Sequence, residues 1–240
     1  MGLHLKKVEL HRDKFPEKPC YPFDLDVIRK TAGIRFRTPV TYFIGENGSG
    51  KSTLLMAIAR KCGVNIWQGR ERRRYRKSPY EAMLHLAMTV EWTAGPVPGS
   101  LFASQMFRHF AQVLDEWAVT DPGILDYFGG RSLLSQSHGQ SLMSFFKNRF
   151  AIPGLYLLDE PETALSPKTQ IELLKLLKRM GEGGHAQFVV ATHSPIVMAC
   201  PGAVIYSFDE APPRRVEYEK TDHYQVYHRF MTDPRACLGE

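Results

Sequence analysis

The chain has none of the features that mark membrane-spanning or secreted proteins. No apolar run among its 240 residues reaches the length needed to cross a bilayer. The first residues, Met-Gly-Leu-His-Leu-Lys-Lys, do not contain the apolar core of a signal peptide. The four cysteines are scattered over positions 20, 62, 200 and 237 and form no metal-ligand pairs. We therefore expect a cytoplasmic protein with reduced thiols and no membrane insertion.

Internal repeats, low-complexity tracts and long heptad segments are also missing. The hydrophobic fraction of 43% is ordinary for a globular core, and the length predicts one large domain covering residues 1–240. Turn signals at Asp121-Pro-Gly and Gly129-Gly interrupt otherwise helical sequence. They indicate a small helical lobe at about residues 106–150 of this domain.

The octapeptide at residues 45–52 carries the strongest chemical signal, because it matches the phosphate-loop pattern G-x-x-x-x-G-K-[ST] at every fixed position. A β-branched and aromatic strand precedes it, and a helix with one apolar face follows it. Its glycines let backbone N–H groups face a phosphate, while Lys51 reaches the β- and γ-phosphates and Ser52 holds Mg²⁺. The predicted nucleotide-binding residues of this loop are Gly45, Glu46, Asn47, Gly48, Ser49, Gly50, Lys51, Ser52 and Thr53.

A second apolar strand ends in two carboxylates, Asp159 and Glu160. Acids at the carboxyl end of a buried parallel strand lie at the edge of the sheet where phosphates bind. We expect Asp159 to contact the Mg²⁺ sphere and Glu160 to orient and deprotonate the attacking water. A surface Asp-Glu turn would explain the pair in isolation, but the phosphate loop favours the catalytic interpretation.

Two further groups indicate a γ-phosphate contact and a second anion site. His193 follows another apolar strand, so it is expected at the same sheet edge, where it can donate a hydrogen bond to the γ-phosphate. Ser137, Gly139 and Gln140 come before a helix-like run and predict an anion-binding helix start. The phosphate loop already binds the γ-phosphate of its own subunit. This second anion-binding site is therefore expected to contact the nucleotide of another copy of the chain.

These motifs resemble those of the ABC-type ATPases, in the branch of stand-alone ATPases often labelled "AAA family". That branch is similar to the ATPase heads of chromosome-maintenance and double-strand-break-repair proteins. The similar segments are 45–52 (Walker A), 155–160 (Walker B), 136–140 (signature), 162–166 (D-loop) and 191–194 (switch-histidine strand). Gln136 and His138 depart from the signature Leu-Ser-Gly-Gly-Gln, and Ser166 stands where the D-loop usually has Asp.

The resemblance implies ATP and Mg²⁺ as cofactors, catalysis by Glu160 with Lys51 and His193, a nucleotide-dependent head-to-tail homodimer and a protein partner. It also implies a Q-loop glutamine that helps to hold the metal. Gln68 and Gln105 are candidates, and Gln105 is better placed because it follows a predicted strand end at 101–104. Heptads are absent before the signature, so the chain resembles the head without coiled-coil arms.

Three functions stay open. The leading one is a Mg²⁺-dependent ATPase that drives or gates a partner in a nucleic-acid repair or phage-defence assembly. An ATP-binding subunit of a membrane transporter would use identical chemistry, although the signature departures and the lack of an evident coupling region argue against it. The third is a nucleotide-gated interaction module with little turnover. ATP rather than GTP rests on the resemblance, since no N-K-x-D motif is present.

Much of the net charge of +6 lies in the run Arg70–Lys77, which holds six cations in eight residues. Such a run can bind nucleic acid phosphates, or it can be a solvated edge whose like charges resist aggregation. The residues that contact adenine are less defined, and Arg12, Phe15 and Tyr21 are weak candidates.

The predicted fold is an α/β P-loop NTPase with a parallel core, an antiparallel layer and the helical lobe. A helix is predicted to begin at the N-cap Ser166 and to stop at Gly181. The other predicted helices are 52–61, 106–119, 141–150 and a last one, 222–231, that closes the chain. The predicted strands are 40–44, 155–159 and 187–191 in the core, 6–12, 34–37 and 89–92 in the layer, and a late pair at 204–208 and 216–218.

Overall fold

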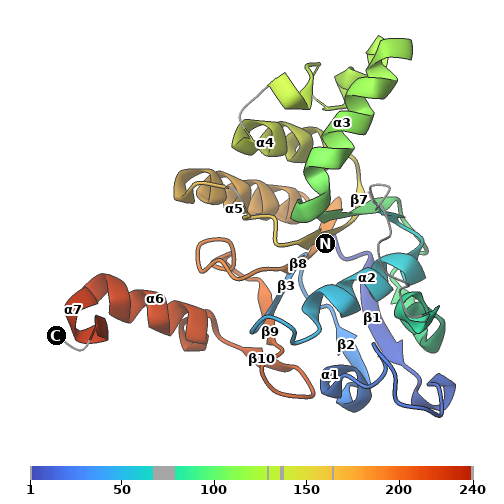
Figure 1. Cartoon of the computed structure of the whole chain (residues 1–240), viewed down its shortest axis with the longest axis vertical. Helices are drawn as coiled ribbons and strands as arrows, with labels where there is room; N and C mark the ends of the chain where they lie inside the picture. Colours follow the sequence, from blue (N-terminus) through green and yellow to red (C-terminus); the bar gives the residue numbers. More distant parts are fainter. Residues whose placement is uncertain (1, 67–78, 129, 136–137, 164, 239–240) are drawn as a thin grey trace.

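A computed structural model of the chain describes residues 2–66, 79–128, 130–135, 138–163 and 165–238 (Figure 1). The strands within these residues are β1 (Leu5–Leu10), β2 (Gly33–Arg35), β3 (Val40–Ile44), β4 (Asn65–Ile66), β5 (Met88–Trp92), β6 (Gly99–Ala103), β7 (Gly154–Asp159), β8 (Ala186–Ala191), β9 (Val204–Ser207) and β10 (Arg214–Val216). The helices are α1 (Asp26–Lys30), α2 (Lys51–Cys62), α3 (Ser104–Thr120), α4 (His138–Arg149), α5 (Pro167–Glu182), α6 (Asp222–Thr232) and α7 (Pro234–Leu238).

The main sheet has the strand order β10-β9-β3-β8-β7-β6-β4, and its neighbours from β9 to β4 run parallel. All residues of β3 and β8 are buried, as expected for strands that are covered on both faces. A separate antiparallel sheet has the order β2-β1-β5. The predicted α/β fold with a parallel core and an antiparallel layer is therefore confirmed.

Side chains on the two faces of the main sheet belong to two different cores. In β3, Tyr42 and Ile44 pack into one core while Phe43 packs into the other, because successive strand residues point to opposite faces. The first core holds the buried aromatic residues of α3 and α4. The second holds the apolar face of α2 and the small sheet. In Figure 1, α3, α4 and α5 accordingly lie on one side of the sheet, and α2 with β1 and β2 on the other.

Helix α5 begins as predicted, because the side chain of the N-cap Ser166 accepts a hydrogen bond from the backbone of Thr169. The predicted stop at Gly181 is wrong, since α5 continues past that residue. A Cβ atom at position 181 would lie 3.1 Å from Pro39 Cβ and 3.3 Å from Val40 Cγ2. Glycine thus allows a close approach of α5 to the start of β3, and it does not end the helix.

Other boundaries also differ from the sequence predictions, and three of the differences affect how elements begin or end near the site or the end of the chain. The strand paired with β9 ends at Val216 instead of beginning there, because Tyr218 already starts a 3-10 turn, η6 (Tyr218–Lys220). Helix α4 begins three residues earlier than predicted, so Gly139 and Gln140 lie in its first turn. Helix α6 does not close the chain, because α7 follows it. Both of these last helices extend away from the body of the domain and contain no buried residue (Figure 1).

Candidate nucleotide site

The glycine-rich loop joins the carboxyl end of β3 to the first turn of α2. Three of its glycines adopt a positive φ, namely 135° at Gly45, 82° at Gly48 and 95° at Gly50. A Cβ atom at Gly45 would lie 2.9 Å from Asp209 Oδ1, and one at Gly50 would lie 2.6 Å from Val27 Cγ1. Both the backbone conformation and the available space therefore require glycine at these two positions.

Lys51, the first residue of α2, is buried and folds back across the loop. Its Nζ donates hydrogen bonds to the carbonyl oxygens of Gly45, at 2.6 Å, and Glu46, at 2.8 Å. Burial lowers the pKa of the ammonium, while the carboxylates of Glu160, Asp209 and Asp159 among others oppose that shift. The loop thus holds one desolvated cation at its mouth, as a phosphate site requires.

Ser52 and Asp159 come together from α2 and the end of β7, and the serine hydroxyl donates to Asp159 Oδ1 at 2.8 Å. Burial raises the pKa of Asp159, and the hydrogen bond from Ser52 acts in the opposite direction. A hydroxyl and a carboxylate are hard oxygen ligands of the kind that Mg²⁺ takes alongside phosphates and water. No cluster of three or more His, Cys, Asp or Glu side chains among the described residues could hold a metal by itself. The pair fits a magnesium ion whose remaining ligands come from a nucleotide and water.

Glu160 has a φ of 48° and is the one non-glycine residue with a positive φ in the described part of the chain. Such a conformation is strained for a residue with a side chain, and strain of this kind is concentrated at functional sites. Two hydrogen bonds hold the backbone of Glu160 in this conformation. The Glu160 N–H donates to the carbonyl of Ala191 at 2.8 Å, and the Glu160 carbonyl accepts a hydrogen bond from the hydroxyl of Ser104. These two hydrogen bonds fix the backbone of Glu160 just beyond the end of β7.

His193 lies beside Glu160, with 3.8 Å between His193 Nε2 and Glu160 Oε1. That nitrogen is buried and has no hydrogen-bond partner among the described residues. The backbone N–H of His193 donates to Glu162 Oε1 at 2.8 Å, which fixes the turn after β8. Burial lowers the pKa of the imidazole, the charge of Lys51 adds to this shift, and Glu160 opposes it. The lowered pKa favours the neutral imidazole, and its Nε2 faces the carboxylate of Glu160.

Three residues hold this arrangement in place although the sequence did not assign this role to them; of these, Glu162 begins the D-loop segment 162–166. Asp209 follows β9; its Oδ1 accepts the Glu46 N–H at 2.8 Å and its Oδ2 accepts the Ser207 hydroxyl at 2.7 Å. The rule that found Asp159, a carboxylate just beyond a parallel strand, would also have found Asp209. Ser104 and Glu162 carry no such signal. Their partners are backbone groups that only the folded chain brings near.

The predicted metal ligand Gln105 is the second residue of α3, directly after β6. The backbone of Gln105 therefore lies at the carboxyl edge of the sheet, where Asp159 and His193 also lie. The predicted strand ended at residue 104, whereas β6 ends at Ala103. A Cβ atom added at Gly139 would contact Leu165 and Thr169, near the start of α5, so this part of the signature lies against α5. Ser137, Gln68 and the basic run 70–77 lie outside the described residues.

Among the candidates for an adenine contact, Tyr21 is placed nearest to the loop. Its hydroxyl is 2.8 Å from Thr53 Oγ1, and its ring is exposed. Phe15 instead packs its ring against Phe23, with ring centroids 5.0 Å apart, so it stabilises the local fold. Arg12 is exposed in a short 3-10 turn.

Comparison with known proteins defines the class. Residues 133–199 match a family model described as "AAA domain, putative AbiEii toxin, Type IV TA system", and residues 24–63 match one described as "AAA domain". The fold is similar to the SMC head domain from Thermotoga maritima, with 20% identity, a TM-score of 0.50 and coverage of 90% of this chain and 100% of that one. It is also similar to CbiO1 from Clostridium perfringens, with 18% identity, a TM-score of 0.51 and coverage of 98% of both chains.

One relative shows the family, and a second is similar at lower identity and with less of its own length covered. The thiamine import ATP-binding protein ThiQ of Haemophilus influenzae is 31% identical over 173 residues, which cover 63% of this chain and 74% of the relative. The iron(3+)-hydroxamate import ATP-binding protein FhuC of Bacillus subtilis is 29% identical over 169 residues. The aligned part covers 64% of this chain and 62% of the length of FhuC. The chain belongs to the ABC-type P-loop ATPases. Every helix in the described part of the chain is too short or too polar to cross a membrane.

Proposed function

We propose that the chain binds ATP with Mg²⁺ at the loop 45–53 and hydrolyses it. The observation that carries this proposal is the convergence of five side chains at the carboxyl edge of the main sheet. They come from the start of α2 and from the ends of β7 and β8, and they are Lys51, Ser52, Asp159, Glu160 and His193. Each has the chemistry that one part of phosphoryl transfer needs.

Each side chain takes one role in this proposal. Lys51 gives its ammonium to the β- and γ-phosphates, and Ser52 and Asp159 hold Mg²⁺, with Gln105 as a further ligand. The metal ion neutralises the charge that develops on the phosphate oxygens. Glu160 orients and deprotonates the attacking water as a general base. His193 donates from its free Nε2 to the γ-phosphate.

The signature residues Ser137, Gly139 and Gln140 act in trans in this proposal. The atoms closest to a Cβ added at Gly139 belong to Leu165 and Thr169 and not to the phosphate loop. A second copy related by a two-fold axis would place this helix start over the nucleotide of its partner. ATP would then close the pair and hydrolysis would open it.

We further propose that this cycle gates a protein partner in an assembly of the nucleic-acid repair or phage-defence kind. The match to a family model described in terms of a toxin of a type IV toxin–antitoxin system supports this direction. Nucleic acid would contact the basic run Arg70–Lys77. Neutral substitutions in that run should then weaken DNA or RNA binding and reduce its dependence on salt.

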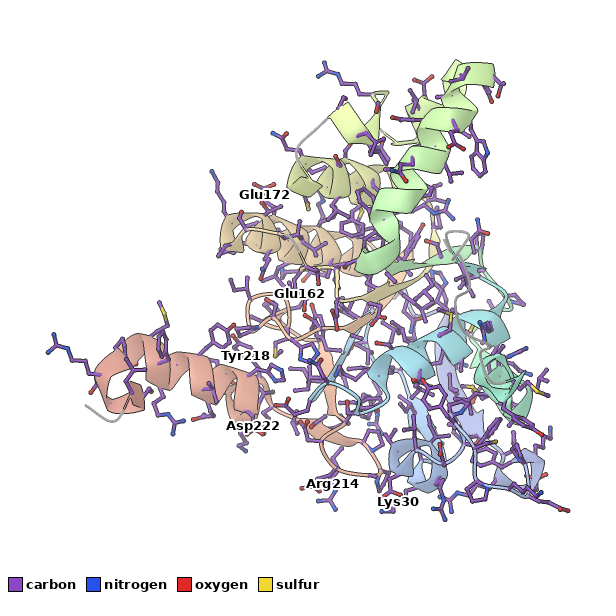
Figure 2. The ribbon with its side chains drawn as sticks, in the orientation of Figure 1. Lys30, Glu162, Glu172, Arg214, Tyr218 and Asp222 are labelled. Carbon is purple, nitrogen blue, oxygen red and sulfur yellow. The ribbon has the colours of Figure 1, made fainter. Side chains whose placement is uncertain are left out.

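Substitution of Glu160 by Gln tests the proposal, because it removes the base but keeps the size of the side chain. Turnover should fall by about 100-fold or more, the scale for loss of a general base, while ATP still binds. The protein with ATP and Mg²⁺ should also elute as a dimer. Glu172→Gln, on the exposed face of α5 (Figure 2), is the matched control and should hydrolyse ATP at the wild-type rate. Wild-type turnover in Glu160→Gln would show that Glu160 is not the base.

A transporter ATP-binding subunit is the second candidate, favoured by the relatives whose names describe import systems. A nucleotide-gated module with little turnover is the third. Turnover measured with the purified chain, alone and with DNA or RNA, separates these functions. Stimulation by nucleic acid supports the repair or defence assembly, and a rate near zero under all conditions supports the gated module.

A further inference from the structure

His193 contacts a second histidine through the ring nitrogen that points away from Glu160. The Nε2 atom of His223 lies 3.4 Å from His193 Nδ1, and the two ring centroids are 5.5 Å apart. His223 is the second residue of α6 and belongs to none of the motifs found in the sequence. The contact leaves Nε2 of His193 facing Glu160 Oε1 at 3.8 Å.

The two nitrogens of His193 have different surroundings, and these select one tautomer. A neutral imidazole carries one proton, and only the protonated nitrogen can donate. If Nδ1 carried that proton, the lone pair on Nε2 would face the carboxylate of Glu160. With the proton on Nε2, the N–H faces the carboxylate, and Nδ1 becomes an acceptor that needs a donor. The Nε2–H of His223 is the donor within reach.

The first turn of α6 holds His223 at a fixed position. The N-cap Thr221 is buried, and its hydroxyl donates to the carbonyl of Tyr218 at 2.7 Å. The hydroxyl of Tyr218 donates in turn to the carbonyl of Pro195, two residues after His193, at 2.9 Å. Figure 2 shows Tyr218 where α6 meets the body of the domain. The start of α6 is thus tied to the segment that carries His193, although the helix itself is exposed.

We propose that His223 is a positioning residue for γ-phosphate recognition, because its Nε2–H donates to His193 Nδ1 and so fixes the tautomer that donates from Nε2. The identity of the phosphate rests on the function proposed above, whereas the tautomer is a property of the chain without nucleotide. His223 also belongs to α6, so the exposed helix and the γ-phosphate contact are joined through two side chains. Whatever displaces the first turn of α6 will change the donor presented to the nucleotide.

The tautomer can be measured directly without nucleotide. In protein labelled with nitrogen-15 histidine, long-range proton–nitrogen spectra show which ring nitrogen is protonated, and the His193 signals are those lost in His193→Gln. Wild type should give the Nε2–H form. His223→Ala should give a mixture with the Nδ1–H form, and His223→Gln, which keeps a side-chain donor, should restore Nε2–H. His228→Ala, five residues further along α6, is the matched control and should give the wild-type tautomer.

Nucleotide affinity gives the second measurement. His223→Ala should weaken ATP binding by about tenfold, the value of one hydrogen bond to a charged group. ADP affinity should stay at the wild-type level, because ADP lacks the γ-phosphate, and His228→Ala should change neither affinity. An Nδ1–H tautomer in wild type, an unchanged tautomer in His223→Ala, or equal losses of ATP and ADP affinity would each overturn the proposal. Absence of ATP binding and hydrolysis in the wild-type protein would instead contradict the proposed ATPase function and leave the tautomer result standing.

Discussion

Replacement of Lys51 by Met should separate nucleotide binding from stability. The Lys51 side chain is only 5% exposed, and methionine retains most of its unbranched stem while removing the ammonium. Hydrogen bonds that involve a charged group contribute about 1.5–3 kcal/mol each. Loss of the contacts to two phosphates thus costs about 3–6 kcal/mol, which predicts that ATP and ADP affinities fall by about 100-fold to 10,000-fold.

The stability of the nucleotide-free protein should respond differently. The substitution removes two hydrogen bonds to carbonyl groups, at 2.6 Å and 2.8 Å, but it also removes a cation whose burial lowers its pKa. A lowered lysine pKa means that the folded environment disfavours the charged form, so the two effects oppose each other. We expect a melting temperature within a few degrees of wild type.

Titration calorimetry with ATP and thermal denaturation without it measure the two quantities. Lys61→Met, at the other end of α2, is the matched control and should keep wild-type nucleotide affinity. Wild-type affinity in Lys51→Met would refute the assignment of Lys51 to the phosphates. A large fall in melting temperature would show that the two lost hydrogen bonds contribute more to stability than the desolvation of the ammonium costs.

Three further outcomes are expected. In the Glu160→Gln background, Ser137→Arg should abolish the ATP-dependent dimer in size-exclusion chromatography while ATP still binds, and persistence of the dimer would exclude this helix start as the trans site. Gly181→Val should lower the free energy of unfolding in denaturant titration by about 1–3 kcal/mol through overpacking, whereas Glu182→Ala on the exposed face should not. The lowered pKa of His193 means that the unfolded chain binds its proton first, so wild-type stability should fall as pH drops through about 6.5. His193→Gln should reduce that fall, and an identical pH profile would contradict the pKa shift.

The phosphate loop and the core strands could be predicted because their signals are local. An octapeptide with fixed positions, apolar strands and carboxylates at strand ends can all be read within a few residues. The boundaries were less certain for a physical reason. Gly181 has the pattern of a helix stop, but tertiary contact with Pro39 and Val40 determines its role. Residue 216 lies at the end of β10 because η6 follows two residues later.

Asp209 could have been found by the rule that found Asp159, but two other supporting residues could not. Ser104 reaches Glu160 across 56 positions of sequence. His223 meets His193 across 30 positions. Such pairs leave no periodic pattern in one sequence, and each side chain alone resembles an ordinary polar surface residue. They act by orienting a catalytic or binding group, so only the packed chain reveals them.

The register of the parallel sheet explains why so many functional groups meet at one edge. Asp159 lies opposite Ala191, and Ala191 lies opposite Phe43 on the next strand. The segments that leave these three strands therefore emerge level with one another and deliver Glu160, His193 and the glycine-rich loop to the same place. The link through His223 extends this arrangement by one more element, because α6 starts beside the histidine that follows β8. If His223 positions His193 as proposed, a partner bound to α6 would act on the γ-phosphate contact without approaching the nucleotide.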